Sequence, residues 1–359
     1  MTTARIASSL TGLTSLLADE QIWADHQPYL EARGYMLRPR YRPGWVSEAI
    51  RLGKSVFQCE DSIAAHECWV LDATRISDGA QMILKIVELS SPDVTISSFL
   101  ANEPGARNYT VPLVDIFPMP EHETWGWMAM PRMRGCHDIP LVFKTVREFA
   151  EFMHQVLEGL VFLHSKNIAH RDICTQNIAM DASRLIPGGF HFIHPHTSDG
   201  LNLLGRFEPH RIKTRTEAGP MKYYYIDFGL SVQFPSFEAR ELVNNRRCGR
   251  LRKHVPEISD TVPYDPFKLD VRLVGEMIRI EFLEWYLGLD FIIPFMKKLR
   301  RQNPKRRPDA ATALDLFQQH MSRMSEADLG RPLALPFRSS RIHKIRGQVA
   351  LAWKTFQLR

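Results

Sequence analysis

The sequence has few features of secreted or membrane-bound proteins. Its five cysteines form no C-x-x-C pair and follow no regular spacing, which argues against a disulfide framework. We therefore expect free thiols in a reducing compartment, the cytoplasm or alternatively the nucleus. The N-terminus lacks the charged and apolar regions of a signal peptide. The apolar run 291–296 is short and contains Pro294, so we expect no membrane span.

Features of nucleic-acid-binding proteins are also missing. The net charge is +6, and the chain has no basic stripe interleaved with aromatic residues and no known reader motif. We therefore expect no nucleic-acid partner. The composition, 44% hydrophobic and 24% charged, is typical of a folded protein over most of its length. There is no internal repeat, and 359 residues suffice for one large domain or for two parts with their own cores.

The pattern of apolar residues changes from strands to helices along the chain. Apolar runs of strand length occupy residues 68–73, 81–87, 111–117 and 125–130, and Pro92 begins a helical pattern. From Phe149 to Leu163 apolar residues lie three or four apart, which predicts a helix that ends near residue 164. Residues 271–287 and 310–324 also have helical patterns. The order of elements predicts an α+β fold.

Two short motifs carry the candidate chemistry. The first is His170-Arg-Asp-x-x-x-x-Asn177, which supplies the carboxylate of Asp172 and a carboxamide five residues later. The second is Asp227-Phe-Gly229, which supplies another carboxylate on a turn that we attribute to Gly229. Phosphoryl transfer from a nucleotide needs an acceptor for a hydroxyl proton and oxygen ligands for Mg²⁺. The two motifs, in this order, are typical of protein kinases.

Segments outside these motifs allow two interpretations each. Residues 33–45, rich in proline, arginine and aromatics, predict an extended strap packed on the rest of the chain, or alternatively a basic peptide-binding arm. Residues 183–220 form an insertion between two strands, and its His191, His194 and His196 allow a metal site as the alternative to a structural role. The charged residues from 331 to 359 are all basic, which suggests a helix lying on the protein or a contact with an acidic surface.

On these residues, the chain resembles the eukaryotic protein kinase superfamily from about Ser55 to Met324. It is more closely similar to the divergent kinase-like proteins of basidiomycete fungi, through residues 34–45, 169–172 and 263–270 and the long insertion. The resemblance implies a two-lobed fold with an N-terminal extension (1–54), an N-lobe (55–133), a C-lobe (134–325, with the insertion) and a basic tail (326–359). It implies an enzyme that uses ATP and Mg²⁺ to phosphorylate Ser or Thr of a protein substrate.

The resemblance also implies a role for each matched residue. Asp172 matches the catalytic aspartate that orients the acceptor hydroxyl, and Asn177 and Asp227 match the Mg²⁺ ligands. Lys85 matches the lysine that holds the α- and β-phosphates; the alternative is a strand lysine that points to solvent. The glutamate that pairs with this lysine is replaced by Asp93, one methylene shorter, so either the helix lies closer or the pair lengthens.

Further matches concern the nucleotide base and the supporting structure. Adenine would use the carbonyl of Pro131 and both backbone groups of Met133, with Met130 at the back of its pocket or simply in the core. Arg307 is expected to pair with Glu257. An aspartate at a helix start, Asp270, is expected to accept N–H groups of the Asp172 loop.

Three departures from the kinase pattern stand beside these matches. The chain has no glycine between Gly53 and Gly79, so residues 61–66 replace the glycine-rich phosphate loop. Asp93 stands in place of glutamate, and Cys174 in place of the catalytic-loop lysine, whose loss can cost about 3 kcal/mol of transition-state stabilisation. Arg250 is our candidate to replace that lysine at the γ-phosphate.

These departures keep two other functions open. The first is a pseudokinase that uses the same fold as a nucleotide-binding or scaffold module, and the second is a small-molecule kinase. The segment 230–254 contains only Ser231 and Ser236 as hydroxyl residues, so we expect no activating phosphorylation near residue 246.

Overall fold

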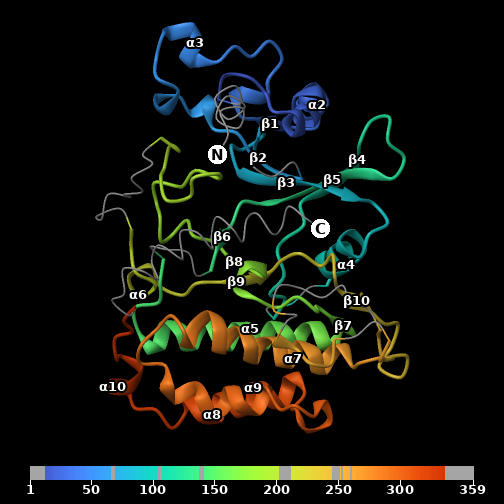
Figure 1. Ribbon diagram of the computed structural model, residues 1–359, viewed down its shortest axis with the longest axis vertical. Coiled ribbons are helices and arrows are strands. Elements are labelled where there is room, and N and C mark those ends of the chain that lie inside the picture. Colours follow the sequence, from blue (N-terminus) through green and yellow to red (C-terminus); the bar gives the residue numbers. More distant parts are fainter. Residues whose placement is uncertain are drawn as a thin grey trace, which may run out of the picture.

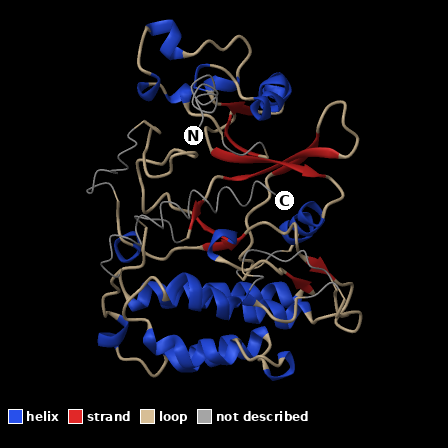
Figure 2. Ribbon diagram, viewed as in Figure 1, coloured by secondary structure: helices blue, strands red, loops and turns tan. Residues whose placement is uncertain are grey.

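The computed structural model describes residues 13–65, 69–103, 105, 107–136, 141–201, 212–244, 251, 254–258 and 261–335. Strands and helices are segregated, which confirms the predicted α+β class (Figure 1, Figure 2). The strands are β1 (Tyr35–Leu37), β2 (Val70–Arg75), β3 (Gln81–Glu88), β4 (Asp115–Pro118), β5 (Trp125–Pro131), β6 (Arg134–Gly135), β7 (Ile168–Ala169), β8 (Ile178–Met180), β9 (Tyr223–Tyr225) and β10 (Val232–Gln233).

The longer described helices are α2 (Gln21–Ala32), α4 (Pro92–Ala101), α5 (Val146–Ser165), α7 (Pro266–Met277), α8 (Ile293–Leu299) and α9 (Ala310–Met321). Short helices are α3 (Glu48–Leu52), α6 (Arg215–Ala218) and α10 (Glu326–Leu329). Short 3₁₀ turns are η1 (Ala18–Glu20), η2 (Pro39–Tyr41), η3 (Val56–Gln58), η4 (Glu60–Ser62), η5 (Thr175–Asn177), η9 (Asp290–Ile292) and η10 (Pro304–Arg306), and η8 (Ile278–Leu283) is a π-helical turn.

A curled antiparallel sheet occupies one end of the molecule. Its strand order is β1-β2-β3-β5-β4, and every neighbouring pair is antiparallel. Helices α5, α7, α8 and α9 occupy the other end, and the small sheet β6-β8-β9 lies between the two parts (Figure 1). Helix α4 lies beside the large sheet, on the side that faces the helices (Figure 1).

The helices form where the sequence caps them and gives them an apolar face. Thr145 accepts a hydrogen bond from the backbone N–H of Glu148 and so caps α5, whose predicted apolar stripe is buried. Asp265 caps α7 in the same way, with Pro266 at the first helical position. The continuous helix expected over 271–287 is instead α7 followed by the π-helical turn η8.

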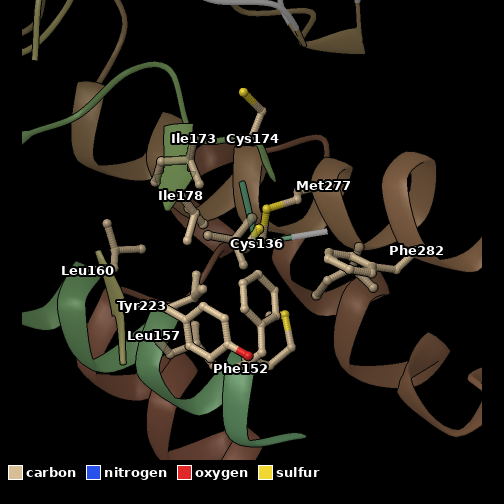
Figure 3. Packing of buried hydrophobic residues seen from close by; sticks show 14 of the residues in the cluster. Cys136, Phe152, Leu157, Leu160, Ile173, Cys174, Ile178, Tyr223, Met277 and Phe282 are labelled. Atoms are coloured by element: carbon tan, nitrogen blue, oxygen red, sulfur yellow. The ribbon is translucent and has the colours of Figure 1, made fainter. Parts of the chain in front are cut away.

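The core of the helical part joins the long helix to the strands of the middle sheet. Figure 3 shows the ring of Phe152 from α5 against that of Tyr223 from β9; their centroids lie 5.0 Å apart with the planes at 84°. Leu157 and Leu160 extend this contact along α5, and Met277 approaches from α7 (Figure 3). The core therefore fixes β8 and β9, the strands that precede the second motif, on the helices.

The described part of the first 54 residues, from residue 13 on, contributes a strand to the sheet. Strand β1 pairs with β2, and α2 packs on β1, so Trp23, Leu30 and Tyr35 share a core with β2 and β3. The sheet therefore begins inside the segment that the sequence assigned to an extension. Helix α2 was not predicted, because it contains Pro28 and has little apolar periodicity.

Among the described residues, no helix combines the length and the apolar character needed to cross a bilayer.

Candidate functional site

Lys85 lies where strand β3 crosses the middle of the sheet, opposite Val70 and Met128. Its Nζ lies 2.5 Å from Asp93 Oδ2 and 2.9 Å from Asp227 Oδ1. The ammonium therefore points toward Asp227, and the solvent-facing alternative does not describe this lysine. Burial alone would lower its pKa, but the two carboxylates raise the pKa of Lys85 above its usual value, so it is charged at neutral pH.

Asp93 uses both carboxylate oxygens. While Oδ2 accepts from Lys85, Oδ1 accepts the backbone N–H of Phe228 at 2.8 Å, and the side chain is 6% exposed. The sequence left two outcomes for an aspartate at this position, and the structure has the short pair rather than the lengthened one. Asp93 thus ties three segments together: α4, β3 and the turn that follows β9.

The turn at Asp227 differs from the expectation. The left-handed backbone conformation belongs to Asp227 itself, with φ of 65°, while Gly229 is not among the residues with positive φ. Burial alone would raise the pKa of Asp227, but Lys85, His170 and the N–H of Gly229 lower the pKa below its usual value. Gly229 therefore acts through its backbone N–H group.

The loop of residues 170–177, called here the Asp172 loop, presents the other oxygen-bearing groups. Asn177 Nδ2 donates to the carbonyl of Asp172 at 2.9 Å, which leaves Asn177 Oδ1 as an acceptor. The carbonyl of Asn177 in turn accepts the N–H of Ile226 at 3.1 Å, which joins the loop to the residue before Asp227. Asp172, Asn177 and Asp227 are therefore held by adjacent segments.

Two carboxylates, from α7 and from the turn η8 that follows it, accept backbone hydrogen bonds from the Asp172 loop. Asp270 is fully buried and accepts the backbone N–H groups of His170 at 2.8 Å and Arg171 at 2.7 Å, which confirms the expected contact. Glu281, in the π-helical turn η8, accepts the N–H of Thr175 at 2.8 Å. Such turns often mark functional sites. Here η8 is the turn that carries Glu281 to the loop.

Arg171 is engaged within the protein. Its backbone has a positive φ of 67°, and its guanidinium donates to the carbonyl of Leu230 at 2.9 Å and to the hydroxyl of Tyr264 at 3.0 Å. Ser231 is buried and its hydroxyl donates to the carbonyl of His170 at 3.1 Å. The segment after Asp227 is thus already joined to the Asp172 loop without a phosphate group.

The residues expected to bind adenine lie at the edge of the sheet. Met130 and Pro131 end β5, where they pair with Ile83 and Met82. Met133 lies between β5 and β6, and its backbone makes no hydrogen bond to another described residue. All three side chains are partly exposed.

The expected phosphate loop is replaced by a long connection. Residues 38–69 join β1 to β2 and contain η2, α3, η3 and η4. Asp61 and Ser62 are buried in η4, and Asp61 Oδ2 accepts from Trp45 Nε1 at 2.8 Å and from the N–H of Glu48 at 2.7 Å. Asp61 is thus occupied inside the connection, and His66 lies outside the described residues.

Cys174, which stands in place of the catalytic-loop lysine, is uncharged. Cys174 is 2% exposed, and burial together with the nearby Asp172 and Glu281 raises the pKa of its thiol well above the usual value. A neutral thiol supplies no positive charge. Arg250, the expected replacement, lies outside the described residues.

The part of the insertion around residues 191–200 contacts the β1–β2 connection. His191 Nε2 lies 3.1 Å from Glu60 Oε1, which also accepts from Arg38 at 3.0 Å. His194 Nδ1 lies 2.8 Å from the carbonyl of Gly200. Among the described residues, His191 and His194 make these contacts and neither belongs to a metal-ligand group. The predicted pair of Glu257 with Arg307 is confirmed.

Sequence reasoning missed several supports of the Asp172 loop. Glu281 lies in no motif, and Tyr264 lies in the 263–270 segment but was given no role. Their contacts depend on how the helical part folds. His164 Nε2 lies 3.0 Å from Asp270, and only its place at the end of the predicted helix pointed to it. Two open surface depressions, one between α4 and α5 and one between α5 and α9, include neither Lys85 nor Asp227.

A scan against protein-family models and a search of curated proteins returned no match to this chain. The function therefore has to be argued from the site itself. The site holds one ammonium between two carboxylates, with a third carboxylate and a carboxamide in adjacent segments. Carboxylate and amide oxygens suit Mg²⁺, and an ammonium suits a phosphate.

Proposed function

We propose that this chain is a protein kinase with a two-lobed kinase-like fold, which uses ATP and Mg²⁺ to phosphorylate Ser or Thr of a protein substrate. The observation that carries the proposal is the meeting of Lys85 with Asp93 and Asp227 across the two parts of the molecule. A lysine with a strand position and no function would have no need of two carboxylates from outside its sheet.

Each residue has a separate task in this proposal. Lys85 would exchange its contact with Asp227 for the α- and β-phosphates, while Asp93 keeps it in place. Asn177 and Asp227 would hold Mg²⁺, which neutralises charge on the phosphates when bound. Asp172 would accept the hydroxyl proton and orient the attacking oxygen, because the bonds of Asp270 and Glu281 fix its loop.

The edge of the sheet supports a place for adenine. The backbone of Met133 is free of partners among the described residues, so its N–H and carbonyl are available to a base. Met130 and Pro131, on the last residues of β5, would border the base. Buried free cysteines are consistent with a reducing compartment, so we place the activity in the cytoplasm.

A pseudokinase is the second candidate, and two observations favour it. Cys174 supplies no positive charge where a kinase needs one, and the connection 38–69 replaces the short glycine-rich turn that approaches phosphates. Such a protein would bind a nucleotide or a partner without transfer. A small-molecule kinase is less well supported, because the pairs Glu257–Arg307 and Asp270–His170 match protein kinases.

Two measurements on the same samples test the proposal. Thermal shift with ATP and Mg²⁺ reports binding, and transfer of ³²P to a generic protein substrate reports turnover, for wild type and Asp172→Asn. We expect binding in both proteins and a loss of transfer of about 10²–10⁴-fold in the variant. Asp290→Asn, at an exposed position in η9, is the matched control and should keep full transfer.

The outcomes separate the candidates. Binding of ATP without transfer that depends on Asp172 would decide for the pseudokinase. Transfer that depends on Asp172 but reaches only small hydroxyl compounds would decide for the small-molecule kinase. If the chain bound no nucleotide at any Mg²⁺ concentration, both the protein-kinase and the small-molecule-kinase functions would be excluded.

A further inference from the structure

A second group of chemically active side chains lies in the β1–β2 connection, apart from the Lys85 site. Glu48 at the start of α3, Cys59 between η3 and η4, and Asp61 in η4 each offer one ligand atom, and these atoms lie within 4.8 Å of one another. Cys59 is fully buried and Asp61 is 6% exposed. The cluster combines one sulfur and two carboxylates, a set that suits a divalent cation.

An independent observation shows that the buried end of the cluster lacks a partner for one carboxylate oxygen. The two N–H donors of Trp45 and Glu48 both use Asp61 Oδ2, while Asp61 Oδ1 is buried and has no hydrogen-bond partner among the described residues. The hydroxyls of Ser47 and Ser62, the neighbours of Glu48 and Asp61 in the chain, are also buried without a partner there. Buried carboxylate oxygens without donors are rare unless a cation binds them.

The neighbouring cations that the structure describes leave Asp61 Oδ1 unpaired. Arg40 Nη1 donates to the backbone carbonyl of Asp61 at 3.1 Å, not to its carboxylate. Lys54 Nζ lies 2.7 Å from Glu48 Oε1, and both side chains are substantially exposed, at 46% and 33%. Among the described residues Lys54 forms no ion pair with Asp61, so the buried end of the cluster keeps its unpaired oxygen.

The donor set selects among metal ions. Mg²⁺ and Ca²⁺ prefer oxygen ligands alone and would not use a thiol, whereas Cu(I) prefers sulfur ligands. One thiolate with two carboxylates suits Zn²⁺, which accepts sulfur and oxygen in a four-coordinate site. Three protein ligands leave one position for a water molecule or a neighbouring hydroxyl.

We propose that Glu48, Cys59 and Asp61 form a structural Zn²⁺ site that fastens α3 to η4 within the β1–β2 connection. When Zn²⁺ binds, the Cys59 thiol loses its proton to the solvent, the sulfur becomes a ligand, and Glu48 exchanges Lys54 for the metal. No oxidation or reduction takes part. The site would fix residues 48–61 and so hold the connection on the sheet; it does not depend on the kinase proposal.

The test uses the full chain, stripped of metal with a chelator and titrated with Zn²⁺ alone. We expect one Zn²⁺ per chain, at least a hundredfold weaker binding in Cys59→Ser, and release of about one proton on binding near neutral pH. Cys136→Ser, at another buried free cysteine, is the matched control and should bind as wild type does. Lys54→Ala should bind more tightly, because Glu48 then has no competing partner.

Co²⁺ added to the wild-type chain gives a readout that needs no mutation. A thiolate ligand produces a charge-transfer absorption that carboxylates and histidines do not. Absence of that absorption, absence of stoichiometric Zn²⁺, or equal binding by wild type and Cys59→Ser would each overturn the site; the last outcome would mean surface binding only.

Discussion

Asp93 offers the most direct test of how the site is held. Replacing it with alanine removes two bonds at once. The charge-assisted bond to Lys85, at 2.5 Å, is worth about 1.5–3 kcal/mol. The amide of Phe228, which is 1% exposed, would lose its acceptor, and a buried donor left unpaired costs about 1–3 kcal/mol. We therefore expect Asp93→Ala to lower the free energy of unfolding by about 2.5–6 kcal/mol.

Asp93→Asn separates the two contributions. The carboxamide keeps an oxygen for the amide of Phe228 but loses the negative charge beside Lys85, so only about 1.5–3 kcal/mol should be lost. The measurement is urea unfolding at pH 7, with the slope of the unfolding free energy on urea compared between proteins. Asp115→Ala is the matched control, because Asp115 pairs with Arg33 at 3.1 Å on the surface and should cost at most about 1 kcal/mol.

Two results would refute this reasoning. If Asp93→Ala destabilised the protein no more than Asp115→Ala, Asp93 would not join the segments as described. If Asp93→Asn and Asp93→Ala lost the same free energy, the bond to Phe228 would contribute nothing.

Three other predictions concern neighbouring contacts. Asp270→Asn should lower the unfolding free energy by about 2–4 kcal/mol, because one oxygen that accepts a backbone N–H becomes a donor; urea unfolding within 0.5 kcal/mol of wild type would contradict it. Arg307→Leu should lower the unfolding free energy by about 3–5 kcal/mol, because it leaves Glu257 unpaired. In a double-mutant cycle, the double variant with Glu257→Leu should regain much of this free energy; additive losses would contradict the pair. Burial alone would raise the pKa of Glu60, but His191 and Arg38 hold this pKa below its usual value. The contribution of Glu60 to stability should therefore be present above about pH 4.5 and disappear as the pH falls through the lowered pKa. Melting curves of Glu60→Gln should lack that part of the acid dependence, and an unchanged acid profile would disprove the contact.

The sequence predicted the elements with strong local signals. The helix with a regular apolar stripe around Phe152 and the strand that carries Lys85 were found close to their true bounds. Strand β1 was missed because it has three residues, and its pairing depends on a partner more than thirty residues away in the chain. A pattern read along the chain does not contain such a contact.

The residues of the candidate site also fall into those that the sequence predicted and those that it did not. Motif spacing identified Asp172, Asn177 and Asp227, since these side chains follow fixed positions in two short loops. Glu281 was not identified, because a π-helical turn sets its direction and the apolar pattern reads only as helix. The conformation of the second motif was assigned to Gly229, although the left-handed residue is Asp227; a glycine nearby is a poor guide when a buried ion pair can hold the backbone.

The length of the β1–β2 connection has a consequence for how the chain folds. A hairpin closes within a few residues, but here the whole segment 38–69 must be brought together before β1 can pair. Each doubling of loop length adds about 0.6 kcal/mol of closure entropy, so β1 starts roughly 2 kcal/mol behind a tight hairpin. We therefore expect β2, β3 and β5 to assemble first and β1 to dock late. Until then β2 is an open edge, and newly made chains would be most prone to aggregate at that strand.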